Sequence, residues 1–249
     1  MSLAHLRPRT AGEILDGAFV LYRAHFGVLV GATLLPHLPL LAYRALGPAA
    51  GLTDAPGWEA AAVVYDRLAT LLFWGALVHL CAAAVQGGGL SVGAAYRRAR
   101  GLFWLLLGQS IVAGVLTGLA TLALIVPGIA VYLLYFLAPN VMVVEGLGVS
   151  DSLDRSWSLV RAEWRRVAGV LAVTAVIFLL PFLLVGAVEG MAGAESAWVV
   201  TASGVLQVLL YVLAYPFAAA SATLLYFDCR VRSEALDLVA AAEALPAHA

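Results

Sequence analysis

The chain has 249 residues, of which 63% are hydrophobic and only 12% are charged. A soluble domain carries about 25% charged residues, so this composition excludes a soluble domain of the ordinary kind. The formal net charge of −1 gives no indication of nucleic-acid binding. Because the apolar residues come in blocks of about 20, the length that crosses a membrane, the sequence predicts an all-α, polytopic integral membrane protein.

The first expected element is an amphipathic helix within residues 12–27, GEILDGAFVLYRAHFG. Its apolar positions follow one helical seam, widened on one side: Leu15, Phe19, Tyr22 and Phe26, with Ile14, Ala18 and Leu21. Asp16 and Arg23 share the other face and lie two turns apart, about 10 Å along the axis, so they cannot pair directly. The pattern predicts a helix that lies at the membrane surface.

Six apolar segments of spanning length follow in chain order. They are residues 26–43, 68–85, 102–126, 128–144, 167–188 and 197–227. Pro127-Gly128 is the expected break between the third and fourth, because Pro lacks a backbone donor and Gly adds backbone freedom. Asp66 and Arg67 are expected to cap the outer end of the second. Other prolines lie inside spans, where each frees a carbonyl: Pro36, Pro39, Pro139, Pro181 and Pro216.

The first helix has two later copies. Residues 151–164 repeat its pattern 138 positions later, and residues 91–104 repeat it more faintly 77 positions later. Two copies keep an acid and all three keep a base: Asp16 and Asp154; Arg23, Arg100 and Arg161. We therefore expect three units, each of one surface helix and two spans, at residues 10–87, 88–146 and 147–228, followed by a tail, 229–249.

The arginines predict the orientation. All fourteen basic residues are Arg, and a six-span path with a cytoplasmic N-terminus places twelve of them inside and only Arg44 and Arg67 outside. By the positive-inside rule, both termini are expected in the cytoplasm. The use of Arg without Lys, with abundant Ala, Gly, Val and Leu, is typical of high-GC genomes. The predicted location is therefore the bacterial cytoplasmic (inner) membrane.

Two sets of residues are candidates for chemistry. Glu13-x-x-Asp16-Gly17 partly matches the acidic motif of CDP-alcohol phosphotransferases, but no Gly-x3-Asp-x3-Asp follows, and a surface helix explains the residues. His37 and His79 lie within spans, where an ionisable group is functional or paired with a backbone carbonyl. No nucleophile motif or metal-ligand spacing occurs. We assign no catalytic, cofactor-binding or metal-binding residue.

Three ordered stretches resemble the membrane domain associated with glycerophosphoryl diester phosphodiesterases, a family that includes stand-alone bacterial membrane proteins. They are LRPRTAGEILDGAFVLYRAHFG, APNVMVVEGLGVSDSLDRSWSLVRAEW and TLLYFDCRVRSEALDL, and the resemblance runs from Leu6 to Leu238. In the namesake enzymes a separate barrel, of about 200 residues or more, does the hydrolysis. The resemblance therefore implies a membrane module without phosphodiesterase activity.

We therefore expect a non-enzymatic membrane protein that engages lipids or a partner protein through its cytoplasmic-side helices. The repeats and intramembrane prolines leave a second possibility, a transporter or channel for a lipid-like or amphipathic solute. Expected partners are membrane lipids and a protein partner or second copy, but not nucleic acid. We expect Arg23 and Arg161 to meet either a phosphate headgroup or a neighbouring acid such as Asp154, Asp16 or Glu145. The candidate polar sites are Asp16, Arg23, Arg100, Asp154, Arg161, Glu145, His37 and His79.

Overall fold

The computed structural model describes residues 8–47, 50–51, 57–192 and 197–234, and regular structure in these ranges is entirely helical. The helices are α1 (Ala11–Ala24), α2 (Phe26–Leu46), α3 (Trp58–Val85), α4 (Val92–Gly101), α5 (Phe103–Ala123), α6 (Ile125–Tyr135), α7 (Ala138–Glu145), α8 (Val149–Ala192) and α9 (Ala197–Glu234). The expected tail lies outside the described residues beyond Glu234. Six helical segments are long and apolar enough to cross a membrane, which confirms the predicted all-α polytopic fold.

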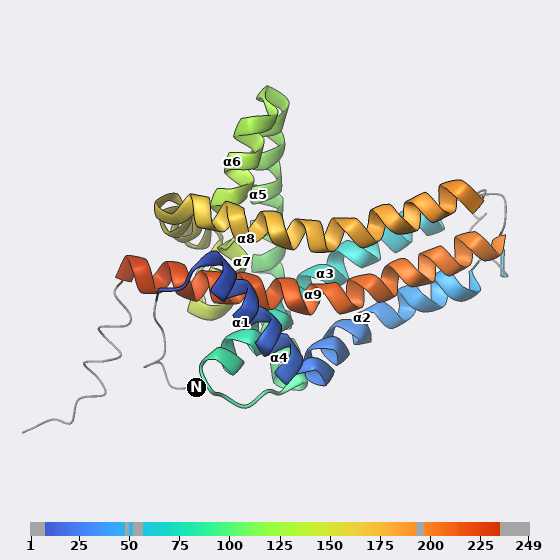
Figure 1. The fold of residues 1–249 in the computed structure, drawn as a ribbon, viewed down its shortest axis with the longest axis horizontal. Helices are drawn as coiled ribbons and strands as arrows, with labels where there is room; N and C mark the ends of the chain where they lie inside the picture. Colours follow the sequence, from blue (N-terminus) through green and yellow to red (C-terminus); the bar gives the residue numbers. More distant parts are fainter. Residues whose placement is uncertain (1–7, 48–49, 52–56, 193–196, 235–249) are drawn as a thin grey trace, which may run out of the picture.

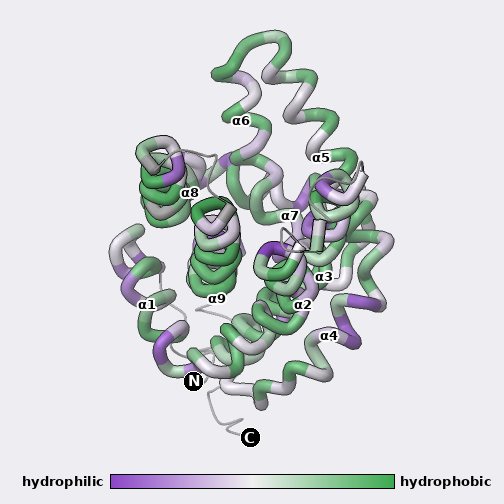
Figure 2. The backbone as a smooth tube through the Cα atoms, turned by 90° about the vertical axis from the view of Figure 1, so that its right-hand side faces the viewer, coloured by the Kyte–Doolittle hydropathy of each residue, from purple (hydrophilic) through white to green (hydrophobic). Residues whose placement is uncertain are grey.

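Four long helices, α2, α3, α8 and α9, run side by side as a bundle along the long axis of the molecule (Figure 1). The α5–α6 hairpin points across this axis, and the view along the bundle shows it projecting from one side (Figures 1 and 2). Apolar residues follow the hairpin along most of its length (Figure 2). The sequence predicted the lengths of these helices but not the direction of the hairpin.

Helix α1 begins at a capping box. The Thr10 hydroxyl accepts from the Glu13 backbone N–H, and the Glu13 carboxylate accepts from the Thr10 backbone N–H, which satisfies two donors at the helix start. Glu13 therefore has a structural role in starting the helix. The helix buries Ile14 and Ala18 completely, while Phe19 stays half exposed. The predicted apolar seam was thus only partly right. Ile14 and Ala18, which were expected only to widen the seam, are its most deeply buried residues, whereas Phe19 on the seam itself is half exposed.

The three copies share one backbone turn between the surface helix and the span that follows. His25 joins α1 to α2 with φ −122° and ψ 25°, and Glu163, 138 positions later, interrupts α8 with φ −123° and ψ 23°. Leu102, 77 positions after His25, joins α4 to α5 with φ −101° and ψ 3°. Three unrelated residue types adopt nearly the same conformation at the equivalent place, so position in the repeat sets this turn.

Burial also matches between the first and third copies. The buried pairs of equivalent residues are Ile14 with Ser152 and Ala18 with Ser156; the exposed pairs are Phe19 with Trp157 and Phe26 with Trp164. Buried serines fit there because each hydroxyl donates to a backbone carbonyl, that of Ser152 to Val149 at 2.8 Å and that of Ser156 to Leu134 at 2.7 Å. These matches support the proposed equivalence of the copies; the unit boundaries stay a prediction.

The break in the α5–α6 hairpin lies at Leu124, which is extended with φ −163° and ψ 148°. Our prediction of a break at Pro127-Gly128 was wrong, because both residues lie in the first turn of α6, where a missing backbone donor costs nothing. Gly128 is needed for another reason. A β-carbon there would run into the side chain of Thr121 and lie 2.8 Å from its Cα, so the two arms can approach only with glycine.

Two further expectations are corrected. Pro139 lies at the start of α7 and does not break a helix, since α6 ends before it at Tyr135. Asp66 and Arg67 lie well inside α3, which begins at Trp58. The helix extends further because its first residues are held against α2: the Arg44 guanidinium pairs with Glu59 at 3.1 Å, and Trp58 stacks on Tyr43.

Candidate functional site

Five of the predicted polar residues belong to α1, α4 and the start of α8, which lie at the same end of the bundle (Figure 1). They are Asp16, Arg23, Arg100, Asp154 and Arg161, and all are exposed. In the described part of the chain no ion pair joins any of them to a protein group. The expected pairing of Arg23 and Arg161 with acids is therefore not seen.

Aromatic rings accompany these arginines. The Arg23 guanidinium lies 5.7 Å above the centre of the Phe19 ring, and that of Arg165 lies 5.5 Å above Trp164. At the second copy Trp104, 78% exposed, packs edge-on against Phe103 close to Arg100 in the chain. Aromatic rings and guanidinium groups side by side are typical of the headgroup level of a membrane. We use the name arginine–aromatic surface for a set of residues on these helices: Phe19, Arg23, Arg100, Trp104, Trp157, Arg161, Trp164 and Arg165.

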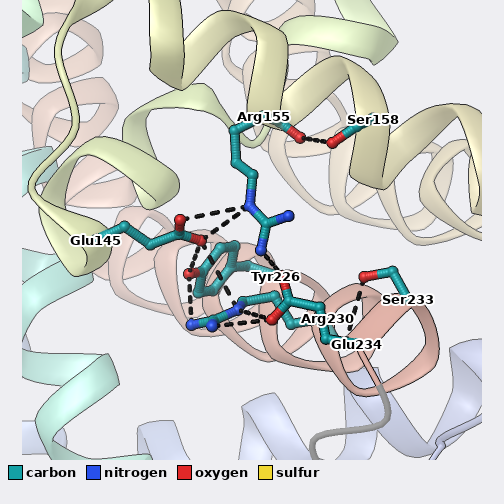
Figure 3. A network of polar contacts seen from close by, with 7 residues as sticks. All are labelled: Glu145, Arg155, Ser158, Tyr226, Arg230, Ser233 and Glu234. Carbon is teal, nitrogen blue, oxygen red and sulfur yellow. Dashed lines mark hydrogen bonds and ion pairs between the residues drawn. The ribbon is translucent and has the colours of Figure 1, made fainter.

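Glu145, the acid expected to meet Arg23 or Arg161, instead belongs to an inner network at the end of α7 (Figure 3). Its carboxylate accepts a hydrogen bond from the Tyr226 hydroxyl at 2.7 Å and pairs with Arg155 at 3.4 Å and Arg230 at 3.7 Å. Glu234 closes the network by pairing with both of these arginines. The expectation for Glu145 was wrong in its partners, because Arg155 faces α9 whereas Arg161 faces outward.

A second inner network surrounds Asp228, whose side chain is completely buried. One oxygen accepts a hydrogen bond from the Arg9 backbone N–H at 2.5 Å. The other accepts from Arg166 at 3.1 Å and from Arg232 at 3.0 Å, and Arg166 also pairs with Glu163 at 3.0 Å. Asp228 therefore ties α9 to the residue that precedes α1 and to α8.

Each network contains two carboxylates and two guanidinium groups, so its charges balance internally. Such arrangements hold helices together and leave no excess charge for a substrate. Our sequence analysis missed them, although the stretch YFDCRVRSE carried a signal: Asp228 and Arg232, and Arg230 and Glu234, are four residues apart and so lie on common helix faces. The spacing indicates paired charges on α9 but does not identify the helices that meet them.

His37 is buried in the bundle. Its ring contacts Phe73, with 4.9 Å between centroids, and its Nδ1 lies 2.7 Å from the Thr33 carbonyl oxygen. This is the structural role that we had weighed against a functional one, a histidine paired with a backbone carbonyl. His79 is half-buried on α3. The two histidines therefore do not share a site.

The carbonyl that Pro36 frees within α2 is satisfied by a tyrosine from another helix. Pro36 frees the carbonyl of Ala32, which accepts a hydrogen bond of 2.6 Å from the Tyr96 hydroxyl. Burial raises the pKa of Tyr96, so its hydroxyl keeps the proton that it donates. The Tyr65 hydroxyl donates to the Pro36 carbonyl at 2.6 Å. A surface helix, α4, is thereby anchored to a span at a proline.

Two adjoining cavities lie where the α5–α6 hairpin meets the bundle. One, of about 560 Å³, lies between α5, α6, α7 and α3 and includes Gln109 and Pro139 in its lining. The other, of about 480 Å³, lies between α6 and α8. Trp74, Tyr132 and Phe136 line both. We call the first the hairpin cavity; its volume is in the range of pockets that hold a small molecule.

The six apolar helical segments indicate a multi-pass membrane protein, and the comparisons with known proteins assign no activity. Within the residues that the structure describes, no cluster of three His, Cys, Asp or Glu side chains could hold a metal ion. No curated protein and no solved structure matches the chain. One family of domains of unknown function, DUF7847, matches residues 60–227, from the start of α3 through most of α9. Since this match covers more than half of the sequence, the chain belongs to the DUF7847 family.

Proposed function

We propose that this protein is a non-enzymatic membrane protein that binds anionic lipid headgroups through the arginine–aromatic surface. The single observation that supports this most directly is that the exposed Arg of all three copies finds no acidic partner in the described residues, while Arg155 and Arg166 of α8 are paired with acids. Guanidinium groups without a protein partner at the headgroup level attract phosphate. The location that we propose is the bacterial cytoplasmic membrane, with this end facing the cytoplasm.

The arginines of α8 differ in whether they have an acidic partner. Arg155 and Arg166 turn inward and are neutralised by Glu145 and Asp228. Arg161, between them in the chain, is exposed and lies one turn from Trp157, itself partly exposed. The helix therefore separates arginines that hold the protein together from an arginine that faces the membrane surface. The resemblance to the glycerophosphoryl diester phosphodiesterase membrane domain agrees with such a module, and we retain it as part of the proposal.

The test compares the retention of two lipids by matched variants. The full chain in detergent is mixed with equal amounts of phosphatidylglycerol and phosphatidylcholine of the same chain length, and retained lipid is counted by native mass spectrometry. Each arginine near an anionic surface contributes about 1 kcal/mol. We expect the wild type to enrich phosphatidylglycerol and this enrichment to fall about thirtyfold in the double variant Arg23→Gln/Arg161→Gln, since two such contributions add to about 2 kcal/mol.

The matched control is Arg44→Gln, which removes the same charge at the opposite end of the bundle, where Arg44 pairs with Glu59. It should retain the full enrichment. Equal enrichment in the wild type and the double variant would refute the proposal. Solute or lipid flux through liposomes containing the protein, clearly above that of empty liposomes, would favour the transporter alternative instead.

A further inference from the structure

The hairpin cavity contains a polar group that the fold leaves unsatisfied. Gln109, on α5, is only 3% exposed and lines the cavity, and its side-chain Oε1 has no hydrogen-bond partner among the described residues. Leaving a buried acceptor unpaired costs about 1–3 kcal/mol, so such a group calls for an explanation. The surrounding lining is largely apolar, with aromatic side chains from α3 and α6.

We propose that the hairpin cavity binds one uncharged amphipathic lipid whose terminal hydroxyl pairs with the Gln109 amide. A hydroxyl both donates and accepts, so it can pair with either the oxygen or the NH2 group of the amide. A single acyl or prenyl chain suits the remaining lining, since Trp74, Tyr132 and Phe136 continue the apolar wall into the adjoining cavity. Lipid binding in this cavity is independent of headgroup binding by the arginine–aromatic surface.

The charge of the ligand follows from what lines the cavity. Among the described residues that line the cavity there is no Arg, Asp, Glu or His, so an ionised phosphate or carboxylate would lose its water there without gaining a counter-charge, which is strongly unfavourable. The hydroxyls of Ser110 and Thr117 are also in the lining. A neutral polar end with a donor therefore fits this site, while the anionic lipids proposed for the surface do not.

The test uses two probes that share an oleoyl chain and differ in the alcohol of the ester, which is a glycerol with two free hydroxyls in one and a methyl group without a hydroxyl in the other. The full-length protein in detergent is mixed with equal amounts of 1-monooleoylglycerol and methyl oleate, and the retained probe is counted by native mass spectrometry. We expect the wild type to retain monooleoylglycerol about tenfold better than methyl oleate, as a hydrogen bond to a buried amide predicts. Equal retention of the two probes would overturn the proposal.

The variants separate the hydrogen bond from the shape of the cavity. Gln109→Leu should fold at least as stably as the wild type, since it removes an unsatisfied polar group, and should retain both probes equally. Gly114→Leu, which places a side chain in the lining, should retain neither. Gln207→Leu removes an amide that lines a separate cavity near Arg44 and Asp66, so it should behave as the wild type does.

Two results would refute the assignment to this cavity. One is an unchanged preference for monooleoylglycerol in Gln109→Leu; the other is an equal loss of preference in Gln207→Leu. Each variant is checked for its melting temperature first. Because surface binding of phosphatidylglycerol is measured on different variants, failure of one proposal leaves the other to be judged by its own result.

Discussion

At the scale of single residues, the molecule uses arginine in two ways that sequence alone does not separate. Arg155 and Arg161 lie six positions apart on α8, yet one closes an inner network with Glu145 and the other is exposed. The difference arises because Arg155 lies on the side of α8 that meets α9. Solvation then decides what each ion pair contributes: buried carboxylates depend on their partners, whereas exposed ones have water.

This difference predicts unequal effects of two isosteric substitutions. Asp228→Asn leaves Arg166 and Arg232 without their shared carboxylate in a fully buried position, so the free energy of unfolding should fall by about 3 kcal/mol. Glu59→Gln removes an exposed carboxylate from Arg44 and should cost less than about 1 kcal/mol. Thermal unfolding of the purified proteins in the same detergent measures both. Equal losses would contradict the role given to Asp228.

At the scale of helices, the spans were predictable and their packing was not. Hydropathy locates a span because the membrane demands apolar residues over its whole thickness, whichever neighbours the helix has. The direction of the α5–α6 hairpin depends instead on close contacts between distant segments. A β-carbon at Gly75 of α3 would lie 3.0 Å from Leu106 of α5 and 3.3 Å from Ala99 of α4. No periodicity in the sequence indicates which glycine meets which helix.

The candidate site was predictable to a similar extent. The repeat identified Arg23, Arg100 and Arg161 from the sequence, because internal similarity needs no knowledge of the fold. The hairpin cavity could not be predicted, since Gln109 is conspicuous only once its neighbours are known. Nor could the turn at Leu124 be found, because its extended backbone is set by the approach of Gly128 to Thr121 rather than by Leu itself.

That approach predicts a strong effect of a small change. Gly128→Val adds a branched side chain where a single carbon already collides with α5, so the arms of the hairpin should separate and stability should fall by about 1–3 kcal/mol. Hydrogen–deuterium exchange of residues 119–131 in detergent should rise. Gly118→Val is the control, since a β-carbon at Gly118 meets no atom within 4 Å. Similar exchange in both variants would rule out the explanation given for Gly128.

At the scale of the whole molecule, the charge distribution predicts which end faces the cytoplasm. Single cysteines at Ala50, beyond α2, and at Gly89, between α3 and α4, lie at opposite ends of the bundle and test this directly. The native Cys81 and Cys229 are buried, so the maleimide should not label them. In intact cells we expect an impermeant maleimide to label Ala50→Cys and to spare Gly89→Cys. The reverse pattern would invert the proposed orientation.

The α5–α6 hairpin adds an even number of membrane crossings whichever way it points. Its two arms are joined at Leu124 by an immediate reversal, so the pair adds either two crossings of the membrane or none. An even number cannot exchange the sides on which the flanking segments lie. Helices α4 and α7, and with them every segment up to α9, keep the same side in both cases. A change in the direction of the α5–α6 pair in the course of evolution would therefore not invert the rest of the protein.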